Sequence, residues 1–190
     1  SPVLVTGLSF SAGDVLQFSA TGEMSRGPGN LLVGPDGNLT TLGATGHNGG
    51  AANGISDYFM PQSALLGVFL TDEQPDLTPV PARLEFATAG IGSLIDFSSL
   101  SPELKQVFYI GDGLDLNGDT QDFVVPVGAT RLFLGTSDIF GWFNNEGGFE
   151  VTVTNASSGG PTDPLSPVPL PAAGWMLIAG VAGLAGLRRR

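Results

Sequence analysis

Residues 130–154, TRLFLGTSDIFGWFNNEGGFEVTVT, decide the fold class of this chain. The two ends of this stretch, 130–134 and 148–154, alternate apolar and polar residues, which is the period of a β-strand with one buried face. The residues between them are rich in Gly, Asp and Asn, which favour turns and loops. We therefore predict two strands with a polar loop between them.

The same strand period recurs along the chain before this stretch. Gly and Pro separate the candidate strands, for example in Gly34-Pro35-Asp36-Gly37. A helical turn is expected only at 101–105, where Ser101 can cap and Pro102 takes the first helical position. The other expected strands are 3–10, 14–21, 64–70, 82–86, 106–110 and 122–125. Many short strands joined by turns predict an all-β domain, a jelly-roll-like β-sandwich, over residues 1–155.

The charge of the chain excludes one class of partner. Three of the seven basic residues are the terminal arginines, so residues 1–187 hold 4 basic against 18 acidic side chains, a net of −14. Such a surface repels phosphate backbones, so we expect no binding to nucleic acid. The chain has no cysteine, and its stability must come from burial or from bound ions.

The C-terminal part has a different organisation. Residues 156–167, ASSGGPTDPLSP, have the composition of a flexible linker. They are followed by Val168-Pro169-Leu170-Pro171-Ala172, by an apolar run to Leu187 and by three arginines. The run from Leu170 is 18 residues long, which is enough for one transmembrane helix at the short end of the range. The arginines favour the cytoplasmic side and place the domain outside.

A VPLPA pentapeptide followed by an apolar helix and an arginine cluster resembles the PEP-CTERM class of bacterial sorting signals, in its VPLPA variant. The resemblance implies an exosortase-type membrane protease as a partner. The protein would be exported, anchored in the membrane by its C-terminal helix, and then passed to the cell surface or the extracellular matrix. An ordinary C-terminal membrane anchor is the other interpretation of residues 168–190.

The loop between the two strands of 130–154 carries oxygen ligands. Asp138 supplies a carboxylate, and Asn144 and Asn145 supply amides, within a tight Gly-rich segment. Carboxylate, amide and main-chain oxygens are the ligands that Ca²⁺ prefers. The other interpretation is a turn in which Asp and Asn bond their own backbone.

Residues 123–153 resemble the C-terminal half of the calcium-dependent, galactose-binding bacterial lectins of the PA-I type. In that family a strand is followed by an Asp, a short loop, an Asn-Asn pair and a final strand that begins Gly-x-Phe. The N-terminal segments Gly13–Val15 and 20–37 are also similar, with their Ser-x-Gly-Pro and Gly-Pro-x-Gly turns. The loop between Asp138 and the Asn pair is one residue shorter than the family pattern, and residues 72–120 have no counterpart.

The resemblance implies a calcium site and its ligands. Side-chain oxygens would come from Asp138, Asn144 and Asn145. Main-chain carbonyls would come from Arg26, which stands where the family uses a tyrosine, and from Trp142 or Gly141.

The resemblance also implies a sugar site beside this calcium, where two neighbouring sugar hydroxyls displace water. Asp138, Asn144, Trp142 and His47 would contact the sugar, with His47 in a loop that aligns loosely with the family's second sugar-binding loop. A solvated loop position is the other interpretation of His47. Trp142 or Phe143 would stack on the sugar, or else pack against the core.

A second loop, residues 115–119, has the alternating Asp-x-Asn-x-Asp spacing of calcium loops. Gly118 is misplaced for an EF-hand and no Glu stands at the twelfth position, so a hairpin connection is favoured.

Together these features predict an exported, calcium-dependent carbohydrate-binding protein whose partner is a glycan or exopolysaccharide. One histidine and no cysteine remove the usual nucleophile and base combinations, so we expect no enzyme. Two other functions stay open. One is a non-catalytic structural surface or matrix protein in which calcium only braces a loop, and the other is a two-carboxylate glycosidase.

Overall fold

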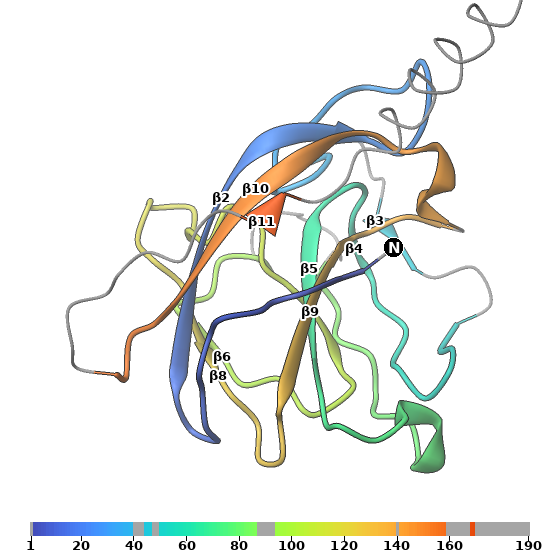
Figure 1. Cartoon of the computed structure of the whole chain (residues 1–190). Coiled ribbons are helices and arrows are strands. Elements are labelled where there is room, and N and C mark those ends of the chain that lie inside the picture. Colours follow the sequence, from blue (N-terminus) through green and yellow to red (C-terminus); the bar gives the residue numbers. More distant parts are fainter. Residues whose placement is uncertain are drawn as a thin grey trace, which may run out of the picture.

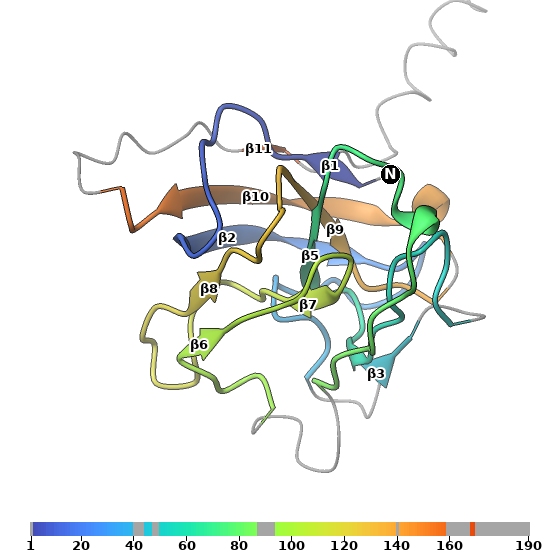
Figure 2. The same ribbon diagram turned by 90° about the horizontal axis from the view of Figure 1, so that it is seen from below.

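The computed structural model describes residues 2–39, 44–46, 50–86, 94–139, 141–158 and 168–169. These residues form an all-β, sandwich-like fold of two main sheets (Figures 1 and 2). The first sheet is antiparallel throughout. Its order is β1 (Val3–Leu4), β9 (Arg131–Thr136), β5 (Leu65–Leu70) and β7 (Val107–Tyr109).

The second sheet is built around one long antiparallel pair, which Figure 1 shows as two curved strands side by side. Its only parallel pair among the described strands joins the short β6 to β8. Its order is β11 (Val168–Pro169), β10 (Glu146–Asn155), β2 (Val15–Ser25), β8 (Asp122–Val124) and β6 (Ser99–Leu100). A small pair of β3 (Ala44–Thr45) and β4 (Met60–Pro61), and the 3-10 segments η1 (Pro75–Leu77) and η2 (Trp142–Asn144), complete the elements.

The core between the sheets is a cluster of aromatic rings. Phe123 of β8 is fully buried and its ring centroid lies 5.0 Å from that of Phe18 on β2. The same ring lies 5.6 Å from Phe108 of β7, which belongs to the other sheet. Phe108 in turn stacks on Phe69 of β5 at 5.3 Å. These contacts fasten the two sheets together through side chains that the strand alternation points inward.

The inner strand β5 of the first sheet is buried on both of its faces. Every residue of β5, with the sequence LLGVFL, is buried. A continuous apolar run is what a strand needs when both of its sides are covered. One face meets the aromatic core, and the residues 50–58 lie over the other.

Most of the strands predicted from the period are confirmed, with shifted ends. Of the strand expected at 3–10 only the short β1 forms, while the strand expected at 14–21 extends to Ser25. The strand expected at 82–86 is wrong, because only Glu85 there forms a bridge, to Phe59. The helical turn expected at 101–105 is also wrong. Lys105 has a positive φ of 66° and donates its N–H to Phe69 O, which a helix at this position would not allow.

Part of the C-terminal prediction lies outside the described residues. Val168 and Pro169 form β11 and pair with Val151 and Glu150 at the edge of the second sheet. The remaining motif residues Leu170, Pro171 and Ala172 and the expected transmembrane helix lie beyond the described ranges. No helix within those ranges is long and apolar enough to cross a membrane.

Candidate metal centre

The polar loop predicted from residues 135–148 connects β9 to β10 through η2. Ser137 fixes its start, because it exchanges main-chain hydrogen bonds with Ala64 and Ser63 and its Oγ accepts the N–H of Ala64 at 3.0 Å. The next residue, Asp138, is therefore held at the end of the first sheet, against the turn that precedes β5.

Tyr58 holds the main chain of Asp138 from the other side. Its phenol oxygen accepts the N–H of Asp138 at 3.0 Å and its O–H donates to the Asp138 carbonyl. Burial raises the pKa of Tyr58 to about 12, so the phenol stays neutral and keeps this donor at physiological pH. The carboxylate of Asp138 is itself buried, and its Oδ1 accepts the N–H of Ile139 at 2.6 Å. The predicted anionic ligand is thus fixed before any ion binds.

Arg26 and Asn144 meet although 118 residues separate them. The β2–β10 register pairs Ser25 with Glu146, which brings the residue after β2 next to the residues before β10. The Asn144 amide donates to the Arg26 carbonyl at 3.2 Å. Gly27 makes this approach possible, because a Cβ atom there would lie 2.6 Å from Asn144 Nδ2.

Asn145 is the buried member of the Asn pair. Its N–H donates to the Trp142 carbonyl at 3.4 Å. Its side-chain Oδ1 is buried and has no hydrogen-bond partner within the part of the chain that the structure describes. Leaving a buried acceptor without a partner costs about 1–3 kcal/mol, so an ordered water or an ion is expected to supply the partner of this oxygen.

Arg26, Asp138 and Asn144 line a hollow of about 320 Å³, whereas Asn145 is not among its described lining residues. Its described lining combines oxygen ligands with one exposed aromatic ring, Phe143, and one guanidinium, that of Arg26. The lining residues are Arg26, Asn30, Asp138, Ile139, Gly141, Phe143 and Asn144. A carboxylate, an amide and a main-chain carbonyl around one space fit the ligand set of a hard cation such as Ca²⁺.

The charge of this site is low for a calcium centre. The described residues contain no group of three or more His, Cys, Asp or Glu side chains that would hold a metal, and Asp138 is the only carboxylate among those of them that line the hollow. Among the described residues Arg83 forms ion pairs with Asp57 and Glu85, and Nε of Arg26 donates to Asn30 Oδ1 at 3.4 Å. Since affinity follows ligand charge, we expect calcium binding on the order of 0.1–1 mM, the range of extracellular modules.

The structure separates Trp142 from the rest of the predicted sugar site. Its indole N–H donates to the Thr136 carbonyl at 2.8 Å, and its ring lines a different cavity, on the first sheet. Phe143, which is 78% exposed, is the aromatic residue at the hollow instead. His47 lies outside the described residues.

The loop at 115–119 forms the hairpin turn that its sequence favours. Asp115 Oδ1 accepts the N–H groups of Asp119 and Asn117, both at 2.9 Å, and these bonds lower the pKa of Asp115. Leu114 and Thr120 form a bridge that closes the turn. The carboxylate therefore caps its own loop, as Asp commonly does in turns.

A half-buried cluster of Asp36 and Asp112 beside the buried Tyr109 was not apparent from the sequence. Asp36 Oδ1 accepts hydrogen bonds from the phenol of Tyr109 at 2.9 Å and from the N–H of Asp112 at 3.0 Å. Burial, together with the charge of Asp36, raises the pKa of Asp112. Gly111 makes room for the cluster, since a Cβ atom there would lie 2.5 Å from Asp36 Oδ1. The sequence predicts Tyr109 on the strand 106–110, and this strand assignment is its only signal for the contact between Tyr109 and the turn at Asp36.

Comparisons with protein-family models, with curated proteins and with solved structures find no match to this chain. The geometry of the site and the sequence motifs are therefore the basis for the function proposed below.

Proposed function

We propose that this protein is an exported, non-catalytic, calcium-dependent carbohydrate-binding protein. One observation carries the proposal: Arg26, Asp138 and Asn144 surround one hollow, and the neighbouring Asn145 has a buried oxygen without a partner. Arg26 lies far from Asp138 and Asn144 in the sequence, so the site depends on the β2–β10 pairing, and Asp138 also bonds the N–H of the next residue, Ile139.

Side-chain and main-chain oxygens of the loop would bind the ion. The carboxylate of Asp138, the amide oxygens of Asn144 and Asn145 and the carbonyl of Arg26 would hold Ca²⁺, with a carbonyl of Gly141 or Trp142 completing the set. The ion would supply positive charge and open positions for two neighbouring hydroxyls of a sugar. Asn144 must then turn its amide from the Arg26 carbonyl toward the hollow.

Side chains that line the hollow would select the sugar. The exposed ring of Phe143 offers an apolar face on which a sugar ring can stack. Asn30 and the guanidinium of Arg26, which also line the hollow, offer hydrogen-bond donors. The strongly acidic surface of the chain favours neutral glycans over anionic ones.

A glycan array probed with calcium-loaded protein tests this function. We expect saturable binding to a set of neutral glycans that chelator abolishes. Phe143→Ala should weaken this binding about 5- to 100-fold, the effect of losing one stacked ring, and should leave calcium binding unchanged. Val127→Ala, at an 84% exposed position between β8 and β9 that does not line the hollow, serves as the control.

Two outcomes would replace the proposal by another function. Calcium binding without binding to any glycan would indicate a structural surface protein in which the ion braces the loop. Release of reducing sugar from the bound glycans would indicate the two-carboxylate glycosidase.

We further propose that residues 168–190 act as a VPLPA-type sorting signal, with a transmembrane helix that retains the protein until an exosortase acts on it. The support is the order of motif, apolar run and arginine cluster in the sequence.

Replacing Val168–Ala172 by alanines and glycines should leave an unprocessed precursor in the inner membrane, because the protease would lose its recognition sequence while the helix remains. Cell fractionation and immunoblotting measure this, with the same replacement at 159–163 in the linker as the control. Normal surface delivery of the motif variant would show that the tail is a plain membrane anchor.

A further inference from the structure

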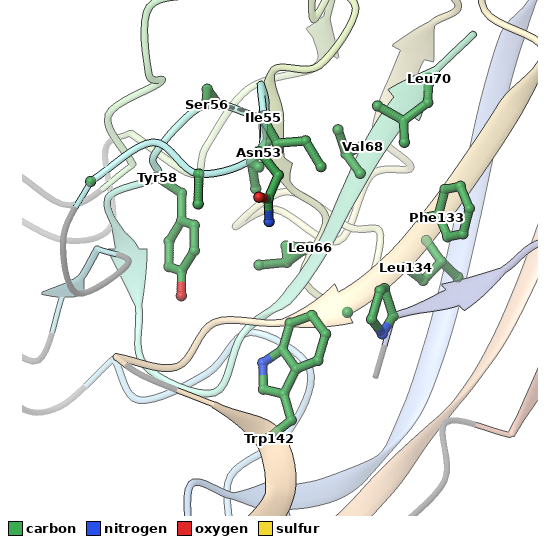
Figure 3. Close-up of a pocket in the computed structure, with 15 residues that line it drawn as sticks. Asn53, Ile55, Ser56, Tyr58, Leu66, Val68, Leu70, Phe133, Leu134 and Trp142 are labelled. Atoms are coloured by element: carbon green, nitrogen blue, oxygen red, sulfur yellow. Dashed lines mark hydrogen bonds between the residues drawn. The ribbon is translucent and has the colours of Figure 1, made fainter. Parts of the chain in front are cut away.

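A second cavity, of about 400 Å³, lies on the face of the first sheet that points away from the aromatic core (Figure 3). Leu66, Val68 and Leu70 alternate along β5 and line it, whereas Phe69 between them packs on Phe108 in the core. Phe133 of β9, the register partner of Val68, lines it as well. The strand alternation thus assigns this cavity to the outer face of the sheet.

Well-anchored groups form the walls opposite the sheet. Trp142 lies over Gly135, where a Cβ atom would come within 3.0 Å of its ring, and its N–H is bonded to Thr136. The turn from Ala52 to Ile55 is closed by two main-chain hydrogen bonds of 3.1 and 3.0 Å. The cavity is therefore bounded by fixed elements on both sides.

This cavity is a half-open pocket, and its volume lies within the range of ligand sites. An apolar cavity of about 150 Å³ stays dry and binds a single benzene ring, whereas ligand sites start at about 300 Å³. About 400 Å³ accommodates a body of two or three rings, or a branched aliphatic body of the same size.

The chemistry of the lining restricts the ligand further. None of the described residues that line the cavity is charged. Ser56 Oγ accepts the N–H of Val107, and the phenol oxygen of Tyr58 accepts the N–H of Asp138. Both polar groups are therefore already hydrogen-bonded within the protein. Asn53 points into the cavity, and its side chain makes no hydrogen bond within the described part of the chain (Figure 3).

We propose that this cavity binds a small, neutral, apolar molecule of two or three rings with one hydrogen-bonding group, which meets the amide of Asn53. The branched side chains of β5 and the rings of Phe133 and Trp142 exclude water from its body. The absence of charge in the described lining disfavours fatty acids and other ions, which would lose their hydration without compensation.

This site is distinct from the calcium site. The described linings of the two cavities share no residue. Tyr58 stands between them, with its ring at the apolar cavity and its phenol group on the main chain of Asp138. The proposal therefore does not depend on calcium or on sugar binding.

The test is titration of the full chain with N-phenyl-1-naphthylamine, a neutral apolar probe of this size with one N–H donor. We expect one saturable component in probe fluorescence, above the linear background from partitioning into the apolar tail. In methyl-resolved NMR spectra the probe should shift the methyl groups of Leu66, Val68 and Leu70. Removing calcium with chelator should leave both signals unchanged, which separates this result from the fate of the calcium proposal.

Two variants sharpen the test. Val68→Phe places a ring in the cavity and should abolish the saturable component. Asn53→Gly keeps the left-handed turn, because Asn53 has φ 52° and Gly adopts this conformation freely. It removes the hydrogen bond from the Asn53 amide to the bound molecule, so binding should weaken about two- to tenfold. A linear response in the wild type, or methyl shifts confined to other parts of the chain, would overturn the proposal whether or not Val68→Phe folds.

Discussion

Phe123→Ala is expected to lower the melting temperature of the calcium-free protein by roughly 6–20 °C. Phe123 is fully buried, and its ring contacts aromatic rings from both sheets. Truncating a buried Phe to Ala costs about 3–5 kcal/mol, from lost transfer free energy and from the cavity that remains. For a domain of this size each kcal/mol lowers the melting temperature by about 2–4 °C.

Phe143→Ala is the matched control, because the same atoms are removed from a ring that is 78% exposed. Substitutions at such positions usually change the free energy of unfolding by less than about 0.5 kcal/mol. Differential scanning calorimetry of both variants measures the contrast. Equal losses of stability in the two would show that the aromatic cluster does not join the sheets.

Calcium is expected to raise the melting temperature by roughly 5–10 °C when its concentration is about a hundredfold above Kd. A ligand that binds only the folded state adds RT ln(1 + [L]/Kd), which is about 2.7 kcal/mol at this excess. The converted shift follows from about 2–4 °C per kcal/mol. Chelator should reverse the rise, and magnesium should not reproduce it, since Mg²⁺ gives up its water reluctantly.

Three variants assign this stabilisation to the hollow. Asp138→Asn keeps the acceptor for the N–H of Ile139 but removes the charge, so most of the calcium-induced rise should disappear. Arg26→Ala keeps the main-chain carbonyl and removes the positive charge of the guanidinium. The same rise in melting temperature should therefore be reached at a lower calcium concentration. Asp115→Asn, in the hairpin turn, should leave it unchanged. A rise that is lost in Asp115→Asn and kept in Asp138→Asn would move the site to the second loop.

The strands that the sequence predicts well are those whose burial follows from their own pattern. β10 alternates strictly, and its residues Phe149, Val151 and Val153 are all buried. β5 is a continuous apolar run, and both of its faces are covered. Residues 82–86 have the same alternation but form only a bridge, because strand formation also needs a partner edge, which no local pattern encodes.

The candidate site shows the same limit. The loop residues Asp138, Asn144 and Asn145 are recognisable from the sequence because they lie close together in it. The contact of Asn144 with Arg26 follows from the β2–β10 register, which the strand period alone does not give. The role of Tyr58 depends on packing over 80 residues of separation and has no signal in the sequence.

The direction of Trp142 also depends on tertiary structure. Gly135 leaves space above the sheet, and the carbonyl of Thr136 accepts the indole N–H, so the ring turns toward the apolar cavity. The neighbouring Phe143 is left at the hollow. The sequence presents two adjacent aromatic residues, and only the fold distinguishes them.

Isothermal titration calorimetry of the full chain with calcium tests the central claim most directly. The account predicts one saturable site per chain with Kd on the order of 0.1–1 mM, lost in Asp138→Asn and retained in Asp115→Asn. Addition of the glycans selected on the array should then give a second saturable signal only in the presence of calcium. A wild-type titration without saturable heat up to several times that concentration would contradict the metal site and the carbohydrate function built on it.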